Sequence, residues 1–131
     1  MSQFGFLQPE WPDLHTAAVR AEIGARADPC ASAFHARRCL EGAVAWLYKV
    51  DARLKQPYQD NLAALIHEPA FRATVGDTIY YKAVYLKDTG NRAVHSPKPF
   101  SEADARTVMR ELFQFAFWLV RTYAKGPKPP D

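Results

Sequence analysis

The residues best placed for chemistry lie in the stretch 87–95. Three polar residues recur there at intervals of four: Lys87, Asn91 and His95. They share one helical face if a helix runs without interruption through Gly90. His95 would then serve as a general base, Lys87 as a charge stabiliser and Asn91 as a hydrogen-bonding positioner. The competing interpretation is structural, because a histidine near a helix end often only caps carbonyl groups or fills a polar niche.

A second polar cluster lies upstream, at Arg37, Arg38 and Glu41. On a helical wheel Arg37 falls within the apolar arc, and a partly buried guanidinium needs a hydrogen-bond acceptor. Glu41 lies one turn further on, so an ion pair with Arg37 is expected, and Arg38 also reaches Glu41 at a spacing of three. We interpret this cluster as a structural ion pair, with catalysis as the alternative. Asp88 and Arg92 are four residues apart and form a similar predicted pair beside the stripe at 87–95.

Metal, phosphate and nucleophile sites have no motif in the chain. The four histidines show no ligand spacing, and the sequence contains no glycine-rich phosphate loop and no nucleophile elbow. Cys30 and Cys39 fall on opposite faces of one expected helix, so they cannot form a disulfide with each other there and are expected to be reduced. We therefore expect no metal and no cofactor in this domain.

Composition favours a single, mostly helical domain. The chain has 131 residues, alanine is its commonest residue, and glycine occurs only 6 times. Its 17 basic and 14 acidic residues give a net charge of +3, which predicts nucleic-acid binding that is weak at best. No apolar run reaches the length of a membrane span and the first residues do not resemble a signal peptide, so a cytoplasmic location is expected.

Start and stop signals predict five helices. Proline suits a first helical turn, Asp60 is an expected N-cap, and residues 101–104 resemble a capping box. Pro69 is expected to end the third helix, and Gly90 is a candidate break or turn in the fourth. The expected helices span about 12–27, 28–50, 60–66, 77–91 and 102–124, which predicts an all-α antiparallel bundle of four to five helices.

The remaining segments are expected to flank or connect this bundle. Residues 1–10 form an N-terminal lead-in whose apolar side chains are able to dock on the body. Residues 11–124 form the bundle, with a rigid connection at 96–99, and 125–131 form a proline-rich linker.

The last helix carries aromatic residues around more than one face. They are Phe113, Phe115, Phe117 and Trp118. Either this helix is central to the core, or its second face is buried by a partner, which predicts a homodimer.

Three segments carry a resemblance to a known family: 34–41 (FHARRCLE), 60–66 (DNLAALI) and 90–96 (GNRAVHS). Together with the opening 6–12 (FLQPEWP), they resemble the helical domain of unknown function at the N-terminus of many type I restriction enzyme R subunits and related DEAD/DEAH-box helicase proteins. The likeness covers about residues 4–124. That domain is itself similar to the HEPN superfamily of helical bundles, some of which are metal-independent ribonucleases.

The resemblance implies a HEPN-like fold and two possible roles. In active HEPN proteins an arginine precedes the histidine by four to six intervening residues. Here the corresponding positions 88–90 hold no arginine, Lys87 lies one residue too far from His95, and Arg92 lies too close. The implied role is therefore a non-catalytic accessory domain. The alternative is a HEPN-type ribonuclease in defence against foreign nucleic acid, with Lys87, Asn91 and His95 as its site.

The resemblance also implies the partners. An accessory domain of this kind would contact a second copy, other restriction-complex subunits or downstream helicase domains, or it would assist nucleic-acid binding. The parent polypeptide would be an ATP-dependent type I site-specific deoxyribonuclease, and ATP and Mg²⁺ would belong to segments outside this domain.

Overall fold

The structure, a computed structural model, describes residues 2–95 and 99–130. Within these residues it contains six α-helices, one short 3-10 helix and no β-strand, which confirms the predicted all-α class. The elements are η1 (Gly5–Leu7), α1 (Pro12–Ala27), α2 (Pro29–Val50), α3 (Leu62–His67), α4 (Pro69–Val75), α5 (Asp77–His95) and α6 (Glu102–Tyr123). Of the predicted rigid connection at 96–99, only Pro99 lies within the described residues.

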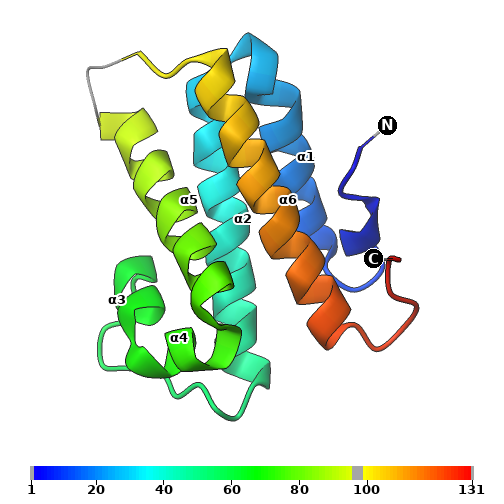
Figure 1. Ribbon diagram of the computed structural model, residues 1–131, viewed down its shortest axis with the longest axis vertical. Helices are drawn as coiled ribbons and strands as arrows, with labels where there is room; N and C mark the ends of the chain where they lie inside the picture. Colours follow the sequence, from blue (N-terminus) through cyan, green and yellow to red (C-terminus); the bar gives the residue numbers. More distant parts are fainter. Residues whose placement is uncertain (1, 96–98, 131) are drawn as a thin grey trace.

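The four long helices lie side by side and alternate in direction along the chain (Figure 1). Helix α2 contacts α1, α5 and α6, and α6 also packs against α1 and α5. The short helices α3 and α4 lie at one end of this arrangement, against α5. Helix α2 is therefore the central helix of the bundle, because it contacts all three other long helices.

Local capping explains where the long helices begin. Proline occupies the first turn of both α1 and α2, and the side chain of Asp28 accepts a 3.2 Å hydrogen bond from the N–H of Ala31. At the start of α6, Ser101 and Asp104 exchange two hydrogen bonds of 3.0 Å between side chains and backbone, which confirms the predicted capping box.

Two details of the middle region differ from the sequence-based prediction. Asn61, not Asp60, caps α3, because its side chain accepts a 2.9 Å hydrogen bond from the N–H of Ala64. Pro69 ends α3 and also begins the short helix α4, which the sequence analysis did not predict. A helix of seven residues completes barely two turns, so it leaves too few apolar repeats to be recognised. Its end is marked by Gly76, whose φ of 88° suits glycine.

The predicted break at Gly90 does not occur, since α5 continues through it to His95. Gly90 is buried, and its lack of a side chain permits a close approach of α2. This packing outweighs the weak helix propensity of glycine.

The N-terminal segment docks on the body of the protein. Phe4 and Leu7 are fully buried, and the ring of Phe6 lies 5.6 Å from that of Phe113 and 5.9 Å from that of Phe117. The second aromatic face of α6 is therefore covered by the chain's own first residues. Phe115 is buried in the core on the other side of the helix.

Both ends of the described chain lie on the same side of the molecule (Figure 1). The carboxylate of Glu10 accepts hydrogen bonds from the backbone N–H groups of Lys125, at 3.0 Å, and Gly126, at 3.1 Å. These bonds hold the segment after α6 against the segment before α1.

Candidate functional site

Arg37 and Glu41 form the ion pair that the sequence predicts. Arg37 Nη1 lies 2.8 Å from Glu41 Oε1, and the two side chains are 25% and 41% exposed. Arg37 Nε is buried and has no hydrogen-bond partner among the described residues. Arg38 does not join the pair; its guanidinium lies over the ring of Phe34, 5.8 Å from the centroid. The cation–π contact satisfies Arg38 locally, so its predicted reach to Glu41 is not used.

The stem of Arg37 also connects the two polar clusters predicted from the sequence. A methyl group at Gly90 would lie 2.6 Å from Arg37 Cβ and 2.7 Å from Arg37 Cδ. Arg37 on α2 therefore lies directly across Gly90 on α5, in the middle of the stripe at 87–95. This crossing explains why a guanidinium stem is buried here and why the facing residue has no side chain.

Lys87, Asn91 and His95 lie on one face of α5, because the helix is continuous over all three. They are not brought into contact with one another. The Lys87 side chain is only 12% exposed, and its Nζ pairs with Asp88 Oδ1 at 2.8 Å. Asn91 and His95 are exposed, and no hydrogen bond joins any two of the three. The stripe thus has the predicted alignment without a hydrogen-bonded catalytic array.

The predicted pairing of Asp88 with Arg92 is wrong. Asp88 pairs with its neighbour Lys87, and the Arg92 guanidinium lies over the ring of Phe100, 5.4 Å from the centroid. Phe100 stands just before α6 and is buried, so Arg92 covers an aromatic ring at the junction with α6. The spacing of four residues predicted a contact between Asp88 and Arg92 within the helix. Nothing in the spacing predicted the contact of Arg92 with Phe100.

A groove of about 570 Å³ runs between α1, α2 and α3. Arg38, Glu41, Asp13 and Asp60 line it together with apolar residues of the three helices. Its charged residues are thus three carboxylates and one guanidinium. No group of three histidine, cysteine, aspartate or glutamate side chains in the described part of the chain is arranged to hold a metal ion.

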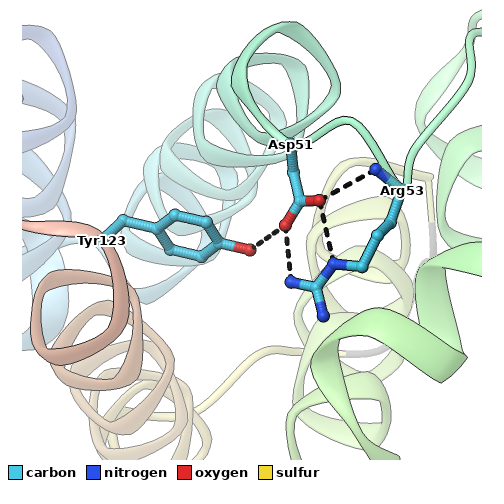
Figure 2. Close-up of polar contacts among 3 residues, drawn as sticks. All are labelled: Asp51, Arg53 and Tyr123. Carbon is cyan, nitrogen blue, oxygen red and sulfur yellow. Dashed lines mark hydrogen bonds and ion pairs between the residues drawn. The ribbon is translucent and has the colours of Figure 1, made fainter.

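A hydrogen-bonded polar cluster that the sequence did not predict is formed by Asp51, Arg53 and Tyr123 (Figure 2). Asp51 caps the end of α2, and its side chain is 8% exposed. Tyr123, the last residue of α6, donates a 2.6 Å hydrogen bond from its hydroxyl to Asp51 Oδ2. Arg53 donates from Nε to Oδ1 at 3.0 Å and from Nη2 to Oδ2 at 2.7 Å. The carboxylate therefore lies between a phenol and a bidentate guanidinium.

These contacts shift the ionisation of the groups involved. The hydrogen bonds from Arg53, followed by that from Tyr123, hold the pKa of the Asp51 carboxyl well below its usual range. Burial, together with the hydrogen bond to Asp51, raises the pKa of Tyr123 to about 12. At neutral pH the cluster thus contains an ionised carboxylate and a protonated phenol, with no group poised to exchange a proton.

One half of this cluster has a signal in the sequence. In an Asx turn, the side chain of an aspartate accepts a hydrogen bond from the backbone N–H two residues further along the chain. Asp51 forms such a turn, because its Oδ1 accepts a 3.0 Å hydrogen bond from the N–H of Arg53. The other half has none, because Tyr123 is 72 residues away.

The cysteines behave as expected from their spacing. Cys30 is exposed, Cys39 is buried, and both are free thiols. Burial raises the pKa of the Cys39 thiol to about 12, so this group is an unreactive part of the core.

Comparisons with known proteins add no relative: the chain matches no family model, no curated protein and no solved structure. None of the described helices combines the length and the apolar character that a membrane crossing needs.

Proposed function

We propose that this chain is a non-catalytic, HEPN-like accessory domain of a type I restriction enzyme R subunit or of a related DEAD/DEAH-box helicase protein. It mediates contacts with a second copy, with other subunits or with downstream helicase domains, or it assists nucleic-acid binding. The domain itself uses no cofactor, and ATP and Mg²⁺ act in the parent enzyme.

The observation that carries the proposal is the use of the polar residues on α2 and α5. Arg37 binds Glu41 and packs across Gly90, and Lys87 binds Asp88. Each ion pair lies within one helix, and the close approach of Arg37 to Gly90 joins α2 to α5. Residues from two of the segments that carry the family resemblance thus form a packing contact, which suits a structural module better than a catalytic one.

An exposed apolar pair supports a contact role. Phe34 on α2 and Val94 on α5 are 37% and 55% exposed. Because Arg37 meets Gly90 and the two helices are antiparallel, Phe34 and Val94 lie about one turn from that crossing, in the same direction. We place the contact with a second copy or another subunit on this pair.

Light scattering at micromolar concentration tests this contact. A second copy bound through Phe34 gives a mass near twice 14.8 kDa, and Phe34→Asp restores the single-chain mass. A wild-type mass of one chain removes the homodimer and leaves heterologous subunits as the partners.

The ribonuclease alternative is favoured by one observation: α5 is unbroken, and Asn91 and His95 are exposed on its surface. Incubation of the purified chain with labelled RNA and DNA in EDTA separates the two functions. RNA cleavage that disappears in His95→Ala, but persists in the exposed control His67→Ala, overturns the non-catalytic proposal. Intact RNA with a folded His95→Ala variant counts against the ribonuclease.

A further inference from the structure

The C-terminal ends of α2 and α6 border a groove of about 560 Å³ whose lining includes none of Lys87, Asn91 and His95. It is lined by Glu10, Trp46, Val50, Tyr123 and Lys125. A second hollow, of about 350 Å³, shares Trp46 and Glu10 with the first and includes Lys49. Trp46 therefore stands between two adjoining hollows, each with a lysine at its side.

Two aromatic rings form a corner in this groove. The rings of Trp46 and Tyr123 lie 5.5 Å apart at an interplanar angle of 88°. Both are held in place, because Trp46 packs edge-on against Trp11 at 5.1 Å and the Tyr123 hydroxyl is bound to Asp51. Val50, which is 50% exposed, extends the apolar surface. A flat heterocycle that stacks on one ring would meet the edge or face of the other.

Two exposed lysines near this corner offer contacts to an anionic ligand. Three carboxylates lie nearby. Glu10 accepts two backbone N–H groups, and Asp51 accepts the groups of Tyr123 and Arg53. Asp13 is exposed and borders the second hollow together with Lys49. Lys49 and Lys125 are exposed and form no ion pair within the described part of the chain. Their ammonium groups remain available to phosphates.

We propose that this groove binds a short single-stranded nucleic-acid segment, with bases stacked on Trp46 and Tyr123 and phosphates beside Lys49 and Lys125. Stacking on protein rings requires bases that are free of a duplex, which is why a single strand fits and a double helix does not. The inference deepens the nucleic-acid part of the proposed function, to which it adds a location and a class of ligand. The net charge of +3 predicts modest affinity with a strong dependence on salt.

Fluorescence anisotropy of the full chain with labelled oligonucleotides tests this site. The probes are oligo-dT and oligo-rU of about ten nucleotides, the site size of one small binding domain, and a DNA duplex of the same length. We expect both single strands to bind at low salt, the duplex to bind more weakly, and Trp46→Ala to lower the affinity about tenfold or more. The comparison of oligo-dT with oligo-rU shows whether DNA or RNA is the preferred ligand.

Two further variants keep the test decisive if Trp46→Ala disturbs the packing against Trp11. Lys49→Gln combined with Lys125→Gln leaves every buried contact intact and should weaken binding and flatten its salt dependence. Tyr81→Ala, an aromatic residue that is 57% exposed outside the groove, should leave binding unchanged. Circular dichroism confirms that each variant is folded.

Three results overturn the inference: no anisotropy change with either single strand, equal binding of the duplex, or affinity that the lysine variant leaves unaltered. Quenching of tryptophan fluorescence by an oligo-glutamate or oligo-proline peptide but not by oligonucleotides would instead assign the groove to a protein ligand. If oligonucleotides fail to bind while Phe34-dependent association persists, only this inference fails. Binding by a monomeric chain would remove only the homodimer contact.

Discussion

The hydroxyl of Tyr123 donates a 2.6 Å hydrogen bond to Oδ2 of Asp51, and this bond joins the C-terminal ends of α2 and α6 (Figure 2). Its acceptor is an ionised carboxylate whose side chain is 8% exposed. We expect Tyr123→Phe to lower the free energy of unfolding by about 1.5–3 kcal/mol, the range for hydrogen bonds to charged groups. Urea denaturation of the wild type and the variant measures the difference.

The matched control for this substitution is Tyr58→Phe. Tyr58 is fully exposed and makes no hydrogen bond within the described residues, so its loss of a hydroxyl should change the stability by less than about 0.5 kcal/mol. Equal effects of the two substitutions would show that the bond to Asp51 contributes nothing.

The same cluster predicts how stability depends on pH at the acid end. The folded-state pKa of Asp51 lies below the unfolded value of about 3.9, so its contribution is present above that pH and is lost as the pH falls through the folded pKa. The stability difference between wild type and Asp51→Asn should therefore be constant near neutrality and shrink below about pH 4. Acid titration of the two unfolding midpoints tests this, and a difference that persists into strong acid would contradict it.

At the alkaline end the sign is reversed. The pKa of Tyr123 is raised to about 12, above the unfolded value of about 10. Its contribution is fully present below pH 10 and is lost as the pH rises from about 10 to about 12. Wild type should lose its advantage over Tyr123→Phe across that interval. The effect of ionising the other tyrosines cancels in this comparison, because both proteins contain them.

The crossing of Arg37 and Gly90 predicts an asymmetry between the two partners of the ion pair. Arg37→Ala removes a buried stem and leaves Glu41 unpaired, so we expect a loss of about 1–3 kcal/mol. Glu41→Ala should cost less, because that side chain is 41% exposed and the pair is screened by water. Thermal melts that place both variants at wild-type stability would refute the packing role of Arg37.

Replacement of Gly90 should destabilise the protein although alanine is the better helix former. The new methyl group would lie 2.6 Å from Arg37 Cβ, an atom that no rotamer change can move away. We expect Gly90→Ala to lower the free energy of unfolding by about 1–2 kcal/mol after the gain in helix propensity is subtracted. Gly5→Ala serves as the control, since nothing lies within 4 Å of its added methyl group. A stabilised Gly90→Ala variant would mean that the helices do not approach so closely.

Docking of the N-terminal segment is tested by Phe4→Ala. Phe4 is fully buried and its ring lies 6.0 Å from that of Phe113, so truncation should cost about 3–5 kcal/mol. Tyr58→Ala is the control, because that ring is fully exposed and its loss should cost far less. If the two variants have the same melting temperature, the first residues contribute little to the stability of the fold.

The sequence predicted the parts of the fold that depend on local chemistry. The bounds of α1 and α2 and the capping box of α6 follow from proline, aspartate and serine at helix starts, and all were confirmed. Gly90 was misjudged because its tolerance within α5 depends on Arg37 from another helix. Helix α4 was missed because seven residues carry too little periodicity.

The candidate sites show the same difference between local contacts, which were predicted, and long-range contacts, which were not. The pair of Arg37 and Glu41 is local to one helix and was predicted, whereas the partner of Arg92 is the ring of Phe100, beyond the end of its helix. Tyr123 reaches Asp51 only after the whole bundle has formed. Contacts between residues far apart in sequence depend on how helices are arranged, and hydrophobic periodicity does not encode that arrangement directly.

The bonds between Glu10 and the backbone of Lys125 and Gly126 span 115 and 116 residues, which has a kinetic consequence. Loop closure over such a length is entropically unfavourable until the intervening helices are in place. We therefore expect these bonds to form in the last stage of folding, after the rate-limiting step. Weakening them by Glu10→Gln should leave the refolding rate unchanged and accelerate unfolding, so the two chain ends govern how long the native state persists and not how fast it forms.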